Sequence, residues 1–333
     1  MPKAHSGRIT KGKIFAFSAS GLANSFCLGL FGGKIIKWKQ SKMNSESTNS
    51  GDGELPTAES RQHGNQQWWT ENTMSYDWKE KVDAPRYSKA WFDEIDSKFY
   101  HGARLFLDVP NPFAVLMDIE TLAGKRVLEI GCGMGMHTEL MLRAGAKLTS
   151  IDISPTSIMA TTKRLELKGL SGDIRQMDAE HLDFANGEFD LVWSWGVIHH
   201  SARTGQVLKQ IDRVLKPGGS AKIMVYALDG MSAYITMMRR YVFGFWAGRQ
   251  IDDLLWKDAD GFTARFYTKD NWSDLLGIFF EDIETRLFGQ DADAVPLPRQ
   301  LRRTALKLYS RERLMRLAAK RGSMLYSVGR KPA

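Results

Sequence analysis

Cysteine is scarce in this sequence. The 333 residues include two cysteines, Cys27 and Cys132, which lie far apart in the chain. Such a pair provides neither a disulfide framework nor the close Cys/His spacing of a zinc site. A small disulfide-stabilised secreted fold is therefore excluded, and the composition predicts no metal site and a reducing, cytoplasmic compartment.

Acidic residues are missing from residues 1–42, which contain eight basic residues and so account for the whole net charge of +8. Residues 298–333 contain eleven basic residues and one acid, Glu312, so residues 43–297 carry a net charge of −10. An acidic central region argues against a surface that follows nucleic-acid phosphates. We therefore expect no nucleic-acid partner there.

The first residues show no pattern typical of a folded domain. Residues 14–33 are mostly apolar and flanked by lysines, yet they include Asn24 and no clear cleavage site follows. An anchor or targeting role, a disordered leader, and an over-extended start with Met43 as the true initiator all remain open. Residues 44–67 are polar and resemble a flexible linker. The predicted division is a leader and linker at 1–67, an aromatic-rich helical cap at 68–120, and the main domain at 121–333.

The strongest motif follows a short apolar run at residues 127–130, which is typical of a buried parallel strand. Three alternating glycines come next, Gly131, Gly133 and Gly135. Glycine permits a sharp turn and lets a ligand approach the backbone, and the amides of the next helix point to the same space. The dinucleotide fingerprint requires a sixth-position glycine, where this chain has Met136. The motif therefore predicts a nucleotide-type ligand other than a dinucleotide.

Alternating strand and helix signals surround this motif. Strands are predicted near 126–131, 147–152, 173–178, 188–195, 219–227, 282–287 and 323–329, and helices near 137–144, 155–169, 204–216 and 271–279. Such alternation predicts an α/β fold with a doubly wound sheet. Asp152 ends the second strand, where a carboxylate can accept both hydroxyls of a ribose.

Together with the glycine turn and Asp152, three further segments resemble the class I S-adenosylmethionine-dependent methyltransferases, especially their ubiquinone/menaquinone-type small-molecule branch. They are Asp178-Ala179-Glu180, the run from Phe189 to His200, and Leu215-Lys216-Pro217-Gly218-Gly219. The resemblance covers roughly residues 120–230. It implies a Rossmann-like, mostly parallel seven-stranded sheet with an antiparallel last strand, S-adenosyl-L-methionine as cofactor, and a small-molecule acceptor.

The resemblance also implies roles for individual residues. The cofactor-binding set is Glu129, Gly131, Cys132, Gly133, Gly135, Asp152, Ile153, Asp178, Ala179 and Trp195. Within it, Asp152 would bind the ribose and Asp178 would border the adenine. His200, ahead of His199, is the candidate catalytic base, because a histidine beyond the fourth strand has a pKa suited to proton removal. The alternative is that His200 only holds the loop and that no base is used.

Two segments exceed the minimal fold. Residues 228–265 are rich in apolar side chains and could form a lid over an apolar acceptor, or could simply pack in the core or a dimer. The second insertion, residues 290–322, includes a basic segment at 298–321 with regularly spaced leucines. That segment predicts an amphipathic helix, which would either pack on the domain or contact membranes or acidic partners. Peripheral membrane contact through 1–42 or 298–321 stays open, as does the oligomeric state.

The function that these features predict is methyl transfer to oxygen, carbon or nitrogen of a small apolar or lipid-like acceptor. The chain lacks an Asn-Pro-Pro-Tyr-like tetrad after the fourth strand and a Pro-Cys nucleophile, which argues against several nucleobase methyltransferases. Three alternatives remain: a lipid-modifying enzyme that uses the same cofactor, an RNA methyltransferase, and a non-catalytic methyltransferase-like subunit.

Overall fold

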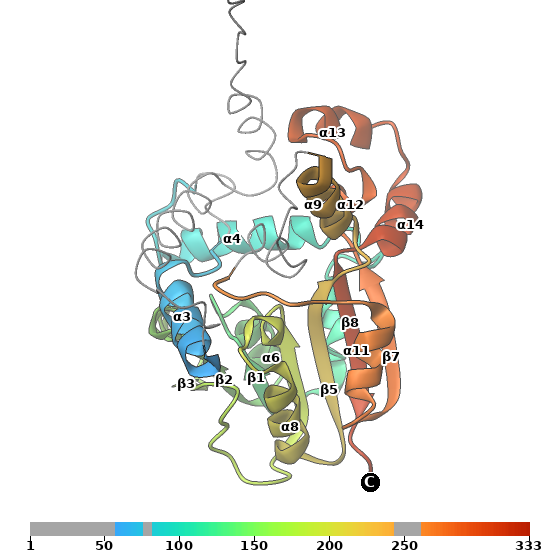
Figure 1. Ribbon diagram of the computed structural model, residues 1–333. Coiled ribbons are helices and arrows are strands. Elements are labelled where there is room, and N and C mark those ends of the chain that lie inside the picture. Colours follow the sequence, from blue (N-terminus) through green and yellow to red (C-terminus); the bar gives the residue numbers. More distant parts are fainter. Residues whose placement is uncertain (1–56, 76–81, 243–260) are drawn as a thin grey trace, which may run out of the picture.

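The computed structural model describes residues 57–75, 82–242 and 261–333 (Figure 1). The predictions made for residues 1–56, and for the part of the proposed lid at 243–260, lie outside the described residues.

One mostly parallel sheet organises the described residues. Its strands are β1 (Arg126–Ile130), β2 (Lys147–Asp152), β3 (Asp173–Gln176), β4 (Phe189–Trp195), β5 (Leu215–Ala227), β6 (Phe266–Tyr267), β7 (Glu281–Phe288) and β8 (Met324–Arg330). Seven of them run in the order β3-β2-β1-β4-β5-β8-β7, and β8 is antiparallel to both of its neighbours. The predicted fold class is therefore confirmed. The two-residue strand β6, which pairs with the end of β5, is additional.

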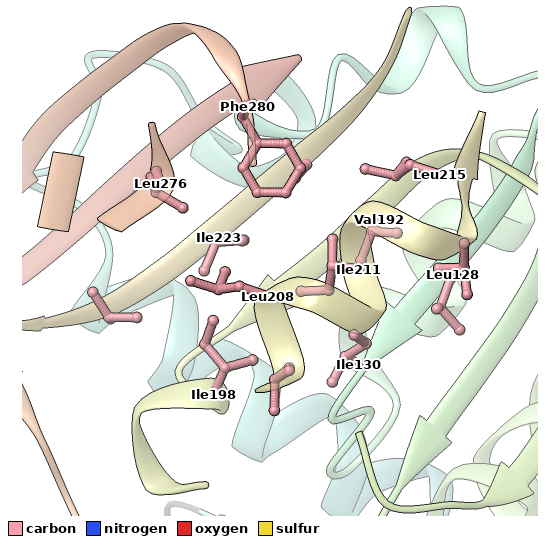
Figure 2. Close-up of a cluster of buried hydrophobic side chains, with 14 of the residues drawn as sticks. Leu128, Ile130, Val192, Ile198, Leu208, Ile211, Leu215, Ile223, Leu276 and Phe280 are labelled. Atoms are coloured by element: carbon pink, nitrogen blue, oxygen red, sulfur yellow. The ribbon is translucent and has the colours of Figure 1, made fainter. Parts of the chain in front are cut away.

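Helices cover both faces of the sheet. They are α5 (Pro112–Leu116), α6 (Met136–Arg143), α7 (Pro155–Lys168), α8 (Thr204–Val214) and α11 (Lys269–Leu276). The spacing of apolar residues in α8 places them on one face of the helix. On this face, Leu208 and Ile211 are fully buried and pack in one cluster with the strand residues Val192 and Ile223 (Figure 2). Burying each such side chain contributes about 1.5–3 kcal/mol. Helices α5 and α6 pack on the opposite face.

Strand β5 begins earlier than predicted. The helix expected at 204–216 ends at Val214, and the strand already starts at Leu215. The register with β4 then shifts, because Phe189 pairs with Leu215 whereas Leu191 pairs with Ser220. The extra residues, Lys216 to Gly219, form an irregularity in the strand, and Gly218 takes a φ of +72° there.

The predicted linker at 44–67 is wrong for its last ten residues. Helix α3 (Ala58–Glu71) begins there, capped by the Thr57 side chain, which accepts a hydrogen bond from the Ser60 amide. Asn65 and Trp68 are buried, so the helix is held by tertiary contacts that its polar composition does not reveal. Helix α4 (Lys89–Gly102) and the short turn η1 (Ile119–Thr121) complete the helical region before the sheet.

The basic segment at 298–321 forms two helices, which corrects the prediction of one. They are α13 (Arg299–Leu306) and α14 (Arg311–Arg321), and the Ser310 side chain caps the second. Helix α12 (Asp291–Ala294) precedes them, and α9 (Met231–Val242) lies in the other insertion. In the described part of the chain, no helix is long and apolar enough to cross a membrane.

Candidate functional site

A cavity of about 760 Å³ opens at the carboxyl ends of the parallel strands. Its floor includes residues from the ends of four of these strands: Ile130 and Trp195 are the last residues of β1 and β4, and Ile151 and Tyr226 are the next-to-last residues of β2 and β5. Helices α3, α4, α9, α12 and α13 contribute side chains above it. Figure 1 shows α4, α9, α12 and α13 beyond this edge of the sheet. Ligands of doubly wound sheets bind at this edge.

The glycine turn forms one wall of the cavity. Gly131 has a φ of +86°, and a Cβ there would lie 2.2 Å from Val197 Cγ2, so a side chain would collide with the loop after β4. Gly133 has a φ of +55°, and a Cβ there would meet no atom within 4 Å. Gly133 therefore presents bare backbone to open space. Gly135, with a φ of +76°, is the N-cap of α6 and is not among the described residues that line the cavity.

Asp152 lies opposite the turn and lines the same cavity. Its Oδ2 accepts the Gly133 amide at 3.0 Å and its Oδ1 accepts the Ser154 amide at 2.9 Å. These bonds fix the carboxylate, and each oxygen retains capacity for a further donor. Burial raises the pKa of Asp152, and the backbone hydrogen bonds oppose that shift.

The predicted adenine-side residues also lie together. Ile153, Asp178 and Ala179 line the cavity next to Asp152. Asp178 Oδ1 accepts hydrogen bonds from Gln62 Nε2 at 2.8 Å and from the Glu180 amide at 2.9 Å. Burial raises the pKa of this carboxyl as well. The side of the cavity near β2 and β3 therefore has two carboxyl groups held by hydrogen bonds, and the apolar residues Ile153 and Ala179 line the same cavity.

Helix α3 closes this side of the cavity, and its residues before Trp68 were predicted to be linker. Gln62, Asn65 and Trp69 line the cavity. Asn65 Nδ2 donates to the His200 carbonyl at 2.6 Å, and Asn65 Oδ1 accepts the Thr263 amide at 3.0 Å. The Trp68-Trp69 pair marked the start of the predicted cap, but no signal placed the preceding ten residues in the same helix.

The two histidines after β4 occupy different places. His200 lines the cavity, and its Nδ1 lies 2.7 Å from the Thr263 carbonyl, so Nδ1 carries the proton and Nε2 is the basic nitrogen of the neutral ring. His199 is fully buried with its ring centroid 4.0 Å from that of Tyr226, and it is not among the described residues that line the cavity. Of the two candidates, only His200 is among the described residues that line the cavity, and its Nε2 atom is itself buried.

Aromatic side chains form the base of the cavity near Trp195. This ring stacks on Trp193 with centroids 5.7 Å apart and meets Phe113 edge-on at 4.9 Å. Trp193 Nε1 donates to His137 Nδ1 at 3.2 Å, and burial lowers the pKa of His137 to about 3. His137 therefore remains neutral. Its presence in the cavity wall was not predicted.

Glu129 supports the turn from behind. It is 1% exposed, it is absent from the described cavity lining, and its Oε2 accepts hydrogen bonds from Thr138 and Ser150 at 2.6 and 2.7 Å. Burial raises its pKa to about 7. Cys132 does line the cavity, and its thiol, whose pKa burial raises, accepts from Thr161 Oγ1 at 3.5 Å.

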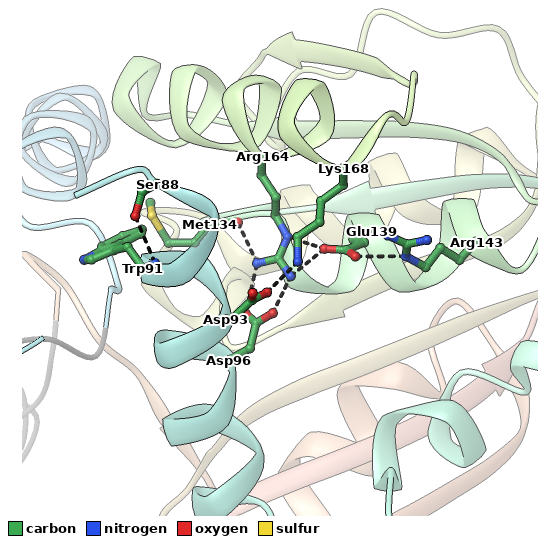
Figure 3. A network of polar contacts seen from close by, with 9 residues as sticks. All are labelled: Ser88, Trp91, Asp93, Asp96, Met134, Glu139, Arg143, Arg164 and Lys168. Carbon is green, nitrogen blue, oxygen red and sulfur yellow. Dashed lines mark hydrogen bonds and ion pairs between the residues drawn. The ribbon is translucent and has the colours of Figure 1, made fainter. Parts of the chain in front are cut away.

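A buried arginine joins the cap to the glycine turn (Figure 3). Arg164 of α7 is 2% exposed, and its Nε donates to Glu139 at 2.8 Å while Nη1 donates to Asp96 of α4 at 2.9 Å. The same Nη1 reaches the Met134 carbonyl at 3.4 Å. One side chain thus links α4, α6 and α7 to the residues that precede α6.

The far end of the cavity is polar and was not recognised as part of the site. Gln290, Asp291 and Asp293 line it next to three arginines of α13: Arg299, Arg302 and Arg303. The basic composition of 298–321 was the available signal. Within the described residues, no group of His, Cys, Asp and Glu side chains could hold a metal ion.

Comparison with known proteins agrees with this geometry. The family model described as Methyltransferase domain matches residues 128–223, which run from β1 into β5. Two similar relatives are the ubiquinone biosynthesis O-methyltransferases of Nitrosococcus oceani, 32% identical over 135 residues, and of Pseudomonas aeruginosa, 38% identical over 136 residues. Each alignment covers 37% of this chain. The chain spans 57% and 58% of the length of these relatives.

A solved structure similar to this chain is an S-adenosylmethionine-dependent methyltransferase from Mesorhizobium loti, with a TM-score of 0.44 and 19% identity. The match covers 66% of this chain and 97% of that structure. The predicted resemblance is confirmed over residues 128–223, which match the methyltransferase family model.

Proposed function

We propose that this protein transfers a methyl group from S-adenosylmethionine to a small organic acceptor bound in the 760 Å³ cavity. The observation that carries the proposal is the pairing of Gly133 and Asp152. Bare backbone faces open space at Gly133, and the Asp152 carboxylate is fixed beside it by two amide hydrogen bonds. These are the features that a ribose with its attached methionine chain requires.

Each part of the cofactor can be assigned to a group of residues that line the cavity. Asp152 would accept the ribose hydroxyls, Asp178 would accept from the adenine amine, and Ile153 and Ala179 would contact the ring. The turn from Gly131 to Gly135 would hold the methionine portion. When bound, S-adenosylmethionine supplies a sulfonium-bound methyl group whose transfer removes the positive charge from sulfur.

The protein's own contribution is alignment and exclusion of water. Holding acceptor and methyl in line can contribute about 7–11 kcal/mol. Trp69 of α3 and Trp195 of β4 line the cavity, and the bond to the Thr263 carbonyl holds His200. With Nδ1 donating to that carbonyl, Nε2 is the atom that would remove a proton from an oxygen acceptor.

The acceptor is proposed to be a small molecule that is largely apolar. Phe99, Phe106 and Met224 line the cavity between the glycine turn and α12, and the enclosed volume is in the range typical of small-molecule sites. The O-methyltransferase relatives favour an oxygen as the atom methylated.

A matched pair of glycine variants tests the proposal. Gly133 and Gly169 both have positive φ, at +55° and +63°, and a Cβ at either meets no atom within 4 Å. Gly133→Leu would place a side chain in the donor side of the cavity. Gly169→Leu would introduce a similar backbone strain at the end of α7, and Gly169 is not among the described residues that line the cavity.

Purified protein is incubated with methyl-labelled S-adenosylmethionine and an organic extract of cells that lack the protein, and labelled products are separated by chromatography. We expect a labelled small molecule with the unaltered protein and Gly169→Leu, and none with Gly133→Leu. Equal labelling by the two leucine variants, or no donor binding by the unaltered protein, would remove the basis of the proposal.

A further inference from the structure

The end of the cavity remote from the glycine turn has a distinct chemical character. Between the two ends the wall is apolar, with Phe99, Phe106 and Met224. Beyond them come side chains of α9, α12 and α13. Figure 1 shows these three helices grouped beyond the edge of the sheet. An apolar middle with a polar end fits a molecule with one polar group.

The acids at this end are already engaged by the protein. Asp291 pairs through its Oδ2 with Arg104 at 2.6 Å, while its buried Oδ1 has no hydrogen-bond partner among the described residues. Asp293 is 2% exposed and accepts the Gln290 amide at 2.8 Å, the Ser232 hydroxyl at 3.4 Å and the Ser323 hydroxyl. Its pKa is raised by burial. Protein groups therefore hold Asp293, and the charge of Arg104 offsets that of Asp291.

Three guanidinium groups lie on the same wall. Arg299, Arg302 and Arg303 come from one helix, α13, and all line the cavity. Arg302 is partly buried, and burial lowers its pKa while Asp291 and Asp293 raise it. Arginine keeps its charge in proteins, and its planar fork suits carboxylate, phosphate and sulfonate groups.

We propose that this end of the cavity binds an anionic group of the methyl acceptor, with Arg302 as its principal contact and the apolar body of the acceptor along Phe99, Phe106 and Met224. The inference rests on the proposed function, because the donor occupies the other end. It adds to that function a substrate class: an acceptor with an apolar body and one carboxylate or phosphate.

The cofactor itself also has a carboxylate, so the donor end must be filled before the acceptor end is probed. Saturating S-adenosylhomocysteine, whose binding is first measured by calorimetry, serves this purpose. Failure of that binding would count against the proposed function. Failure of the following step alone would count against the anionic acceptor.

The probe pair is 8-anilino-1-naphthalenesulfonate and its neutral parent, N-phenyl-1-naphthylamine, which share one ring system and differ by the sulfonate. Fluorescence titrations give the affinity of each with S-adenosylhomocysteine present. We expect the sulfonate to bind at least about tenfold more tightly, as for a hydrogen bond to a charged group. Arg302→Gln should reduce this preference to about twofold, and Arg302→Lys should give an intermediate value.

Arg316→Gln is the matched control, because Arg316 lies on α14 with its side chain 73% exposed. This variant should keep the preference. An unaltered protein without a preference, or a preference that Arg302→Gln leaves intact, would overturn the proposal. If Arg302→Gln instead abolished only cosedimentation with phosphatidylglycerol vesicles, α13 would be a membrane-contacting surface and the acceptor assignment would be wrong.

Discussion

At the scale of single residues, Glu129 makes stability depend on pH. Its pKa rises from 4.5 to about 7 on burial, so the folded protein keeps this proton at pH values where the unfolded chain has released it. Stability from this group is therefore fully present below pH 4.5 and is lost as the pH rises to about 7. The shift corresponds to about 3 kcal/mol.

Glu129→Gln isolates this effect, because glutamine keeps an acceptor oxygen for Thr138 and Ser150 but does not titrate. Between pH 5 and pH 8 the free energy of unfolding of the unaltered protein should fall by about 2–3 kcal/mol more than that of the variant. Urea unfolding at both pH values measures the difference. Identical pH dependence in the two proteins would show that Glu129 does not carry the proton.

His200 is expected to affect turnover rather than donor binding. A general base contributes about 10²–10⁴-fold, so His200→Ala should lower kcat by that order while the affinity for S-adenosylmethionine changes little. His101→Ala, an exposed histidine of α4, is the control. Unchanged turnover in His200→Ala would leave its hydrogen bond to Thr263 as its main role.

The residues of the proposed donor side were predictable from two signals. Alternating glycines after a buried strand indicate a tight turn that a ligand can approach, and an aspartate that ends the next strand can bind a ribose. The sequence alone does not show which of His199 and His200 lines the cavity. They are consecutive in a single 3₁₀ turn, η2 (Ile198–His200), and the turn places one ring in the core and the other at the cavity. Which side faces the ligand depends on β5 and on the segment near Thr263, which are distant in sequence.

At the scale of elements, Arg164 holds the cap helix α4 against α6 and α7. Arg164→Met would leave Asp96 and Glu139 without their buried partner, and we expect a loss of about 3–5 kcal/mol in the free energy of unfolding. Chemical denaturation measures it. Lys163→Met, next in sequence but with its side chain 49% exposed, should cost less than about 1 kcal/mol.

Part of the loss should return in the double variant Arg164→Met/Asp96→Asn, because the uncompensated carboxylate is then absent. A single variant as stable as the unaltered protein would mean that the network does not anchor α4.

Helix α3 shows which elements sequence reasoning misses. Its amphipathic pattern is weak, and its key contacts are amide side chains that bond to loops more than one hundred residues away. Hydrophobic periodicity reports the spacing of apolar residues, so it does not reveal hydrogen bonds from amide side chains. The split between α13 and α14 was missed for a related reason, because spaced leucines continue across the break that Ser310 caps.

At the scale of the whole molecule, the sheet followed from sequence because each βαβ unit is local and right-handed crossovers leave few possible orders. Its β-branched and aliphatic strands, the glycine turn and the proline at the start of α7 all indicate the same topology. The proposed acceptor end was not predictable, since it joins α4, α9, α12 and α13 from three regions of the chain. Only folding brings Phe106, Met224 and Arg302 to one cavity.

The central claim is that this cavity holds S-adenosylmethionine through Asp152. Isothermal titration calorimetry of the full chain with S-adenosylmethionine tests it most directly, with Asp152→Ala as the variant. Asp173→Ala, a β3 carboxylate whose side chain is 40% exposed, is the control. We expect binding by the unaltered and control proteins, and an affinity at least about tenfold lower in Asp152→Ala. An affinity within about twofold of the unaltered protein in Asp152→Ala would contradict the account.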